Sequence, residues 1–381
     1  MKYFVRLLSA LLILAMAFSI VACSDEEKET EGKGPSGTLD FDSEDPSGSD
    51  TEDPSGGSEE PSEEESESKE NETVDMSTYE APTVENPTLS GFELPSSSKL
   101  ELSTVEPTAA EDCTVVTKNA ADIHVGSLIL VNPQFALKKD PADIKDALVN
   151  MFEHRANGAA KGKYQLPGDS IRLQGDAIEA FTSMMVAANT QNAKCSGVLV
   201  SEAYRSAQIQ EDHFNAAGGV NAMQPNHSDF QTGYSLHLKY YGADKLTYTL
   251  GDKNNADAKA AGAIIADLAD DYGFIQRYPA GKSAFTGVDD DVLPHLYRYV
   301  GVPHARIMND GNYTLEEYLE GIKAYTATKP LRVEDGAHVY HVFYVPVAED
   351  AETVSINVPK NRDYTISGNN VDGFIVTVTI S

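Results

Sequence analysis

The feature that most restricts how this chain can fold is an acidic tract between Ser24 and Glu72. It holds 20 Asp or Glu and 3 Lys, so it carries −17 of the formal net charge of −31. Its other residues are mainly Ser, Gly and Pro, with very few apolar ones. Such a segment cannot bury enough apolar surface to offset the entropy lost on ordering. We therefore expect a disordered linker over 24–107, because residues 80–107 also lack patterned apolar positions.

The first 23 residues have the pattern of an export signal. Lys2 and Arg6 form a basic start, and Leu7–Ile20 is almost entirely apolar. About 14 apolar residues are fewer than the roughly 20 that a membrane-spanning helix needs, and a small-residue site after such a run indicates cleavage. The sequence Ile-Val-Ala-Cys at 20–23 resembles a bacterial lipobox, which implies lipidation of Cys23. The alternative is an ordinary signal peptide followed by a chance cysteine.

These two segments together predict a protein anchored by its lipid on the extracytoplasmic face of the cell membrane, with the linker as a stalk. Nucleic acid is excluded as a partner because no basic patch is present to meet phosphates. In an exported protein Cys113 and Cys195 can pair or can remain separate thiols, and the sequence leaves both alternatives open.

Apolar periodicity from residue 123 onward predicts alternating helices and strands. Asp140 and Pro141 have the order of an N-cap and a first helical residue, and Thr314 and Glu317 have capping-box spacing. Helices are expected over 140–155, 176–190, 207–217, 256–272 and 314–325, with a helical turn at 303–308. Strands are expected over 124–132, 196–206, 234–241, 274–279 and 295–301. Alternating apolar residues after 330 predict a small β appendage at 330–381.

Four pieces of sequence, in order, carry a resemblance to a known family. They are "SEAYRSAQIQ" at 201–210, "HSDFQTGYSLHL" at 227–238, "YGFIQRYP" at 272–279, and "LPHLYRYVGVPHA" at 293–305 followed by "TLEEYL". They resemble the motifs of VanY-type D-alanyl-D-alanine carboxypeptidases (peptidase M15-like), zinc enzymes of peptidoglycan metabolism in the bacterial cell wall. The resemblance implies an α+β domain over 108–329, with a central antiparallel sheet and flanking helices. This is the fold of D-Ala-D-Ala carboxypeptidases and of hedgehog-like zinc peptidases.

The resemblance also implies where the chemistry of the family would lie. Two His and one Asp hold the zinc, which leaves an open position and lowers the pKa of bound water, and a Glu is the general base. Here the ligand positions are Phe230, His237 and Leu296, and the base position is Leu293. Phenyl and leucyl groups offer a metal no lone pair. We therefore expect no metal cofactor and a pseudoenzyme, with no catalytic residues.

A relocated zinc site is the alternative. His227, His237 and His295 could bind zinc and give an active D-alanyl-D-alanine metallocarboxypeptidase acting on peptidoglycan. A shift of one residue along a strand turns a side chain to the opposite face, which places His295 away from the side that Leu296 occupies. For His237, the simpler reading is a neutral histidine that is hydrogen-bonded within the domain.

In the family motifs, which we call the motif frame, the residues that face the substrate peptide are still present in this chain. Arg205 and Ser228 match residues that face the substrate peptide in the family, and a guanidinium can bind a carboxylate through two parallel hydrogen bonds. A structural ion pair for Arg205 is equally open. The expected function is a groove that binds a peptidoglycan stem peptide or another peptide C-terminus. A further reading is a structural module whose β appendage docks a partner.

Overall fold

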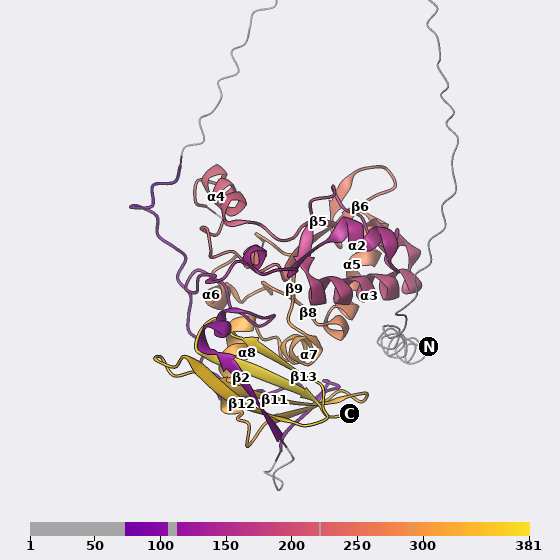
Figure 1. Cartoon of the computed structure of the whole chain (residues 1–381). Helices are drawn as coiled ribbons and strands as arrows, with labels where there is room; N and C mark the ends of the chain where they lie inside the picture. The colour runs from indigo at the N-terminus through magenta and orange to yellow at the C-terminus, as the bar shows by residue number, and fades with distance from the viewer. Residues whose placement is uncertain (1–72, 106–112, 221, 290) are drawn as a thin grey trace, which may run out of the picture. The chain divides into compact units, whose positions relative to one another are not determined.

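The computed structural model describes residues 73–105, 113–220, 222–289 and 291–381 (Figure 1). These residues belong to one compact unit. Cys23 and the acidic tract lie outside the described residues. Within the described part, no helix is both long enough and apolar enough to cross a membrane.

A central antiparallel sheet organises the first half of the described fold (Figure 1). Its strands run in the order β5 (Val198–Glu202), β6 (Ser235–Tyr241), β9 (Leu296–Tyr299) and β8 (Phe274–Gln276), and β7 (Thr247–Thr249) pairs with β6. The helices α3 (Gly175–Gln191) and α5 (Ala256–Leu268) share one apolar core with β5 and β6. The expected α+β class with a central antiparallel sheet is confirmed.

Local sequence signals explain the helices that border this sheet. In α3, Ile178, Phe181 and Met185 recur at helical spacing and are all buried. Gly273 adopts a φ of 82° and ends the turn after α5, a conformation that glycine reaches without strain. The capping box predicted at Thr314 and Glu317 is present at the start of α8 (Leu315–Gly321).

The remaining elements are short. The helices are α2 (Met151–Asn157), α4 (Ala207–Ala216), α6 (Ser283–Thr286) and α7 (Val302–Gly311). The 3-10 turns are η1 (Ala120–His124), η2 (Pro141–Asp143), η3 (Ala193–Gly197), η4 (Asp229–Thr232), η5 (Asp270–Tyr272) and η6 (Ile322–Ala324). The strands β3 (Leu148–Asn150) and β4 (Arg172–Gln174) form a two-stranded sheet.

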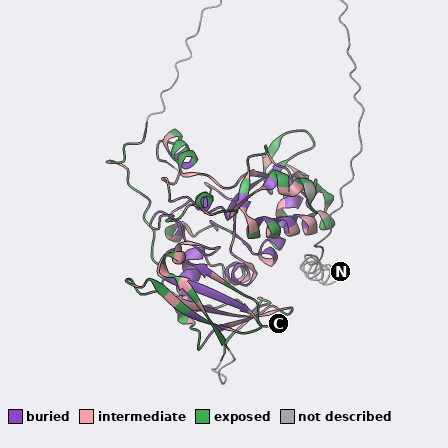
Figure 2. Ribbon diagram, viewed as in Figure 1, coloured by how far each residue is buried: buried purple, intermediate pink, exposed green. Residues whose placement is uncertain are grey.

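A β-sandwich forms the second half of the described fold. One sheet has the order β1 (Glu101–Thr104), β10 (Leu331–Glu334), β11 (Val339–Pro346), β14 (Gly373–Thr379) and β13 (Tyr364–Gly368). It packs against a ribbon of β2 (Cys113–Asn119) and β12 (Thr353–Pro359) through a shared apolar core. Its other face packs on α7 and α8. Strand β14 is therefore covered on both sides and buried along nearly its whole length (Figure 2).

The sandwich corrects two predicted boundaries. Strand β1 lies inside the predicted linker, 24–107, and pairs with β10. Strand β2 belongs to the predicted 108–329 domain but pairs with β12, inside the predicted appendage of 330–381. The physical reason is that strands β10 and β12 would otherwise expose unpaired backbone groups along one edge. The sandwich is thus built from both sides of the peptidase-like segment.

Residues 73–100, also expected to be linker, lie along the folded part in an extended path (Figure 1). The Phe92 ring stacks on Tyr318 and Tyr325, with ring centroids 5.2 and 5.9 Å apart. The Tyr79 ring meets Phe214 of α4 edge-on at 4.9 Å. A few aromatic anchors therefore order a segment that has no regular apolar pattern.

The strand predicted over 124–132 is wrong, because its backbone joins no strand ladder and most of its carbonyl oxygens from Ser127 onward are bonded by side chains. The Arg298 guanidinium donates to the carbonyl oxygens of Ser127 and Ile129, at 2.9 and 3.0 Å. The Arg277 guanidinium donates to the carbonyl oxygen of Val131 at 3.3 Å. The apolar residues of the segment are still buried, as the pattern predicted.

The single helix predicted over 140–155 is also wrong, although both of its local signals are real. The Asp140 carboxylate does accept from the backbone N–H of Ala142, but it caps only the 3-10 turn η2. Asp146 then adopts a left-handed φ of 60°, which a continuing helix cannot include. Helix α2 starts afresh at Met151, capped by the Asn150 side chain.

The two cysteines in the described residues are free thiols. Cys113 is exposed at the start of β2, and Cys195 is buried in the core of the central sheet. Burial raises the pKa of the Cys195 thiol to about 11. Of the two alternatives left open by the sequence, the structure therefore shows separate thiols and no disulfide between Cys113 and Cys195.

Candidate functional site

The candidate site lies on the face of the central sheet that turns away from α3 and α5. In β6, Leu236 and Leu238 belong to the helix-side core. Since side chains alternate along a strand, His237 points to the opposite face. Leu296 of β9 is directly opposite His237 in the register and shares that face. The structure therefore brings two of the four expected chemical positions side by side.

The other two positions join Leu296 in one apolar cluster. Phe230, from the turn η4, is 1% exposed and Leu296 is 0% exposed. Leu293 packs against the same cluster. The other members are Tyr278, Val288, Met223 and Val292. The resemblance requires a metal ligand or a base at Phe230, Leu293 and Leu296. All three are apolar side chains that pack against other apolar side chains.

The donor chemistry at these positions does not fit zinc. A zinc ion needs nitrogen, oxygen or sulfur lone pairs, with at least three protein ligands at a catalytic site. Phe230 and Leu296 supply none. An apolar surrounding also opposes a divalent cation, because the cation loses its hydration without compensation. No step of a reaction can be derived through a metal at these residues.

His237 remains as the polar member of the set. Its Nδ1 lies 3.2 Å from the Ser201 hydroxyl, which also donates to the His237 carbonyl oxygen at 3.0 Å. Burial, together with the Lys239 charge, lowers the pKa of His237 to about 4. The imidazole is therefore neutral at pH 7.

The alternative ligand set of three histidines does not assemble. His227 uses Nδ1 in a 2.8 Å hydrogen bond with the carbonyl oxygen of Asn132. Burial lowers the pKa of His295. Among the described residues, no group of three His, Cys, Asp or Glu side chains is placed to hold a metal ion. His227, His237 and His295 are all described, and they do not form such a group.

Arg205 takes part in an ion pair, which is one of the two readings left open by the sequence. Its Nε donates to the Glu202 carboxylate at 2.5 Å, and its Nη2 donates to the other oxygen of the same carboxylate. Its Nη1 donates to the Gln210 side chain at 3.0 Å. The guanidinium carbon lies 4.1 Å from the centre of the Phe230 ring. Arg205 therefore stands against the apolar cluster, with 13% of its side chain exposed.

Ser228, the second expected substrate contact, is buried just before η4. Its carbonyl oxygen accepts from the backbone N–H of Gln231 at 3.0 Å. The next residue, Asp229, is bound by two buried arginines. Arg277 Nε and Arg298 Nη1 donate to its carboxylate at 3.1 and 2.7 Å.

Sequence reasoning missed the partners of Arg277 and Arg298. Burial acts to raise the pKa of Asp229, but the two guanidinium charges outweigh it and hold that pKa below its usual range. Glu316 binds Arg277 through both carboxylate oxygens, at 2.8 and 3.1 Å. The acidic residues inside the motifs "HSDFQTG" and "TLEEYL" were the available signal, because fully buried arginines need counter-charges.

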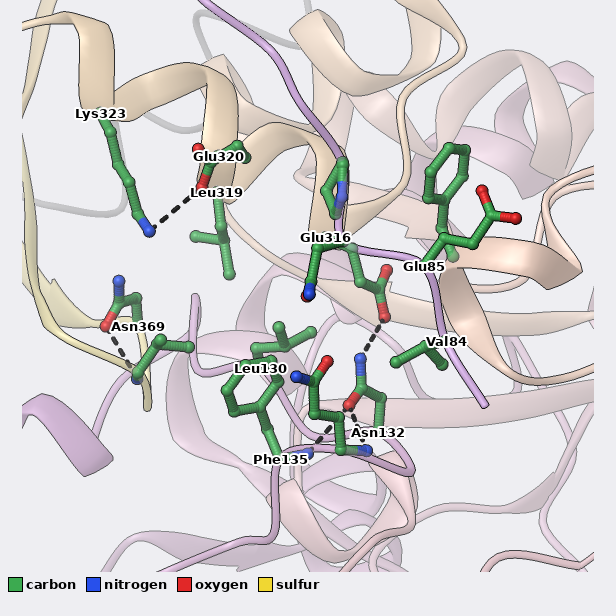
Figure 3. Close-up of a pocket in the computed structure, with 15 residues that line it drawn as sticks. Val84, Glu85, Leu130, Asn132, Phe135, Glu316, Leu319, Glu320, Lys323 and Asn369 are labelled. Atoms are coloured by element: carbon green, nitrogen blue, oxygen red, sulfur yellow. Dashed lines mark hydrogen bonds and ion pairs between the residues drawn. The ribbon is translucent and has the colours of Figure 1, made fainter. Parts of the chain in front are cut away.

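A separate pocket of about 200 Å³ lies between α8, the loop at 130–135 and residues 84–87 (Figure 3). Several of its polar groups have partners within the protein. The Asn132 amide donates to Glu316 and accepts from two backbone N–H groups. Lys323 pairs with Glu320 and Asp372. Its lining shares no residue with the apolar cluster, so it is no part of the candidate site.

Comparisons with known proteins agree with the motifs. A family model described as "VanY: D-alanyl-D-alanine carboxypeptidase" matches residues 170–302. A D-alanyl-D-alanine carboxypeptidase of Enterococcus faecium is 30% identical over 258 residues, covering 67% of this chain and 76% of the relative. The putative carboxypeptidase YodJ of Bacillus subtilis (strain 168) is 28% identical over 204 residues, covering 51% of this chain and 68% of its own length.

Among solved structures, the fold is similar to that of the vancomycin-resistance D,D-dipeptidase VanXYg, determined in complex with a D-Ala-D-Ala phosphinate analogue. The TM-score is 0.58 at 27% sequence identity, and the match covers 70% of this chain and 99% of the other. The sequence relatives and this structure point to one family of peptidases.

Proposed function

Because this chain belongs to the VanY family of D-alanyl-D-alanine carboxypeptidases, we propose that it is a member that binds a peptide C-terminus without cleaving it. The observation that carries this proposal is the apolar cluster of Phe230, Leu293 and Leu296. These residues stand at two ligand positions and the base position of the family frame.

Hydrolysis of a peptide bond needs an activated water and a group that accepts its proton. Leu293 cannot accept a proton, and Phe230 and Leu296 cannot hold the metal that would activate the water. The neutral His237 has its Nδ1 against the Ser201 hydroxyl. The carboxylate registered opposite it, that of Glu202, is paired with Arg205. The chain thus lacks both parts of the reaction at these positions.

The proposed ligand is a peptidoglycan stem peptide or another peptide with a free C-terminal carboxylate. Arg205 and Ser228 support it, since they keep the residue types of the substrate side of the frame. The neighbour VanXYg was solved with a D-Ala-D-Ala phosphinate analogue, which favours the same ligand class here. The role is then recognition or scaffolding at the cell wall.

The proposed location is the outer face of the cell membrane, with Cys23 lipidated and the acidic tract as a spacer. This part rests on the sequence, because those residues lie outside the described structure. The mass of the mature N-terminal peptide tests it: a cysteine at position one carrying acyl chains is expected, and an unmodified thiol contradicts it.

Metal content and activity, measured on the same purified protein, test the loss of catalysis. We expect zinc well below one per chain after dialysis, and no release of D-alanine from a peptide that ends in D-Ala-D-Ala. The Enterococcus faecium relative serves as the positive control. Stoichiometric zinc together with a release of D-alanine that chelators abolish would instead establish the rearranged metallopeptidase.

Calorimetric titration with the same peptide tests the binding half separately. We expect saturable binding that Arg205→Met weakens. Absence of binding to every carboxylate-terminated peptide tried, at millimolar concentrations, removes this half of the proposal while leaving the lack of catalysis intact.

A further inference from the structure

A β-bulge in β5 changes which way Glu202 faces. Val200 pairs with Leu238, but the next registered pair is Glu202 with His237, so two residues of β5 stand opposite one residue of β6. Without this extra residue, alternation would turn Glu202 to the helix-side core, where Leu236 lies. The bulge instead turns Glu202 to the site face, beside His237.

On that face, Glu202 occupies the edge of Arg205 that suits a carboxylate best. The Nε–H and one Nη2–H of a guanidinium are parallel, and a carboxylate that accepts both makes the strong two-point contact. Both Glu202 oxygens take this place, one at 2.5 Å from Nε and the other on Nη2. The pair is only partly exposed, with 13% of the Arg205 side chain and 29% of the Glu202 side chain accessible.

The rest of the guanidinium is also held. Gln210, which is 1% exposed, accepts from Nη1 and donates through its own amide to the Met223 carbonyl oxygen at 2.6 Å. The Phe230 ring covers one face at 4.1 Å, the usual geometry of a cation–π contact. Arg205 is therefore fixed in position, and its two-point edge is filled by a residue of the chain itself.

We propose that Glu202 is an internal competitor that sets the affinity of Arg205 for the carboxylate of a bound peptide. This inference rests on the proposed function. A carboxylate tethered three residues away acts at an effective concentration in the millimolar range or higher, so a peptide carboxylate must displace it. The intact protein consequently prefers a peptide with a free C-terminus over the same peptide with a C-terminal amide by only a small factor.

The test is a titration of two probes, a synthetic pentapeptide ending in D-Ala-D-Ala and its C-terminal amide. Glu202→Gln keeps the size of the side chain and removes its charge. We expect the free-acid peptide to bind this variant about tenfold more tightly or better, in the range of a charge-assisted hydrogen bond, with the amide unchanged. Glu202→Ala should give the same ratio of acid to amide affinity. Glu211→Gln, an equal charge change on the exposed surface of α4, should match the wild-type protein.

The outcomes separate the two proposals. If the wild-type protein binds the acid and both Glu202 variants bind it equally well or less well, Glu202 is not a competitor and the proposed function stands. If no variant binds either probe, the competitor and the binding half of the proposed function are both overturned. If the wild-type protein already binds the free-acid peptide much more tightly than the amide, the peptide carboxylate reaches Arg205 despite Glu202. That result overturns the proposal that Glu202 competes for Arg205. Melting temperatures of all variants identify any that fail to fold. If the Glu202 variants fail to fold, the ratio of the wild-type affinities for the acid and the amide decides whether Glu202 is a competitor.

Discussion

Buried charge dominates this protein at the scale of single residues. Asp229, Arg277 and Arg298 are essentially inaccessible to solvent, and Glu316 is 5% exposed. Each of these charges lost its hydration on folding, and the compensation comes from its partners within the network. The network also binds the carbonyl oxygens of Ser127, Ile129 and Val131, so it fixes a backbone segment as well as its own side chains.

Asp229→Asn should therefore be strongly destabilising. It removes the charge that Arg277 and Arg298 share, and leaving a buried ion underpaired costs about 3 to 5 kcal/mol. Urea unfolding followed by circular dichroism measures the loss. Asp267→Asn, on the exposed face of α5, is the matched control and should change the unfolding free energy by no more than about 0.5 kcal/mol. Equal midpoints for both variants would contradict this account of the network.

The sequence was a good guide to where the chemical positions lie and a poor guide to what surrounds them. The motif frame located Phe230, Leu293, Leu296 and His237 at one place, and the structure groups the first three in one cluster. The sequence could not indicate that the Glu202 carboxylate pairs with the Arg205 guanidinium. That pairing depends on a one-residue β-bulge, which no local sequence pattern predicts. Side-chain pairing across a sheet depends on register, which only the fold sets.

At the scale of elements, α7, α8 and β14 meet at one histidine. His304 of α7 lies 2.5 Å from the Tyr318 hydroxyl of α8 through Nδ1, and 3.0 Å from the Thr377 hydroxyl of β14 through Nε2. Burial lowers the pKa of His304 to about 3. The junction between the helices and the sandwich thus contains a neutral imidazole.

This junction predicts acid sensitivity. A folded pKa below the ordinary value of 6.5 means that the unfolded chain takes up the proton first. The stability that His304 contributes is therefore complete above pH 6.5 and is lost as the pH falls towards 3. At pH 4.5 the loss is about 2 to 3 kcal/mol, a drop of about 5 to 10 °C in Tm. Buried His237 adds to the same trend.

Comparison of wild type with His304→Gln from pH 7.5 to 4.5 isolates the contribution of His304. The variant starts from a lower Tm but should lose less of it as the pH falls. Parallel Tm curves for the two proteins would show that another group causes the acid sensitivity.

Elements were predictable where their signals are local. The helices α3, α4, α5 and α8 follow from apolar spacing and caps. The strand expected over 124–132 failed, since its hydrogen-bond partners are Arg277, Arg298 and the turn at Asn369 and Asn370, far away in sequence. An apolar run specifies burial, and only the fold decides whether a neighbouring strand is there to pair with it.

At the scale of the whole described chain, the sandwich and the peptidase-like part share a core. Leu128, Leu130 and residues of α7 and α8 pack against Val342 and Ile375 of the sandwich. The C-terminal strands are therefore not an appendage that can be removed cleanly, contrary to the division predicted from the sequence.

A chain ending at residue 329 should consequently fail to form the native fold. Loss of residues 330–381 exposes the apolar surfaces of α7 and α8, and we expect aggregation or a non-cooperative thermal transition. The control is internal deletion of residues 30–65, which lies wholly within the acidic tract and should leave the Tm of the folded part unchanged. A soluble, cooperatively melting 1–329 chain would contradict the shared core.

The strands of the sandwich come from distant parts of the sequence, and this affects the order in which they can pair during synthesis. Thr104 of β1 pairs with Leu331 of β10, and Val116 of β2 pairs with Ile356 of β12. A ribosome adds about 5 to 20 residues per second, so β1 and β2 emerge about 10 to 50 seconds before the strands that complete them. Closing loops of this length is also slow relative to local folding. During synthesis these two segments are the first of the sandwich to appear, and they wait longest for their partners. The final 50 residues of the chain thus decide when the whole fold closes.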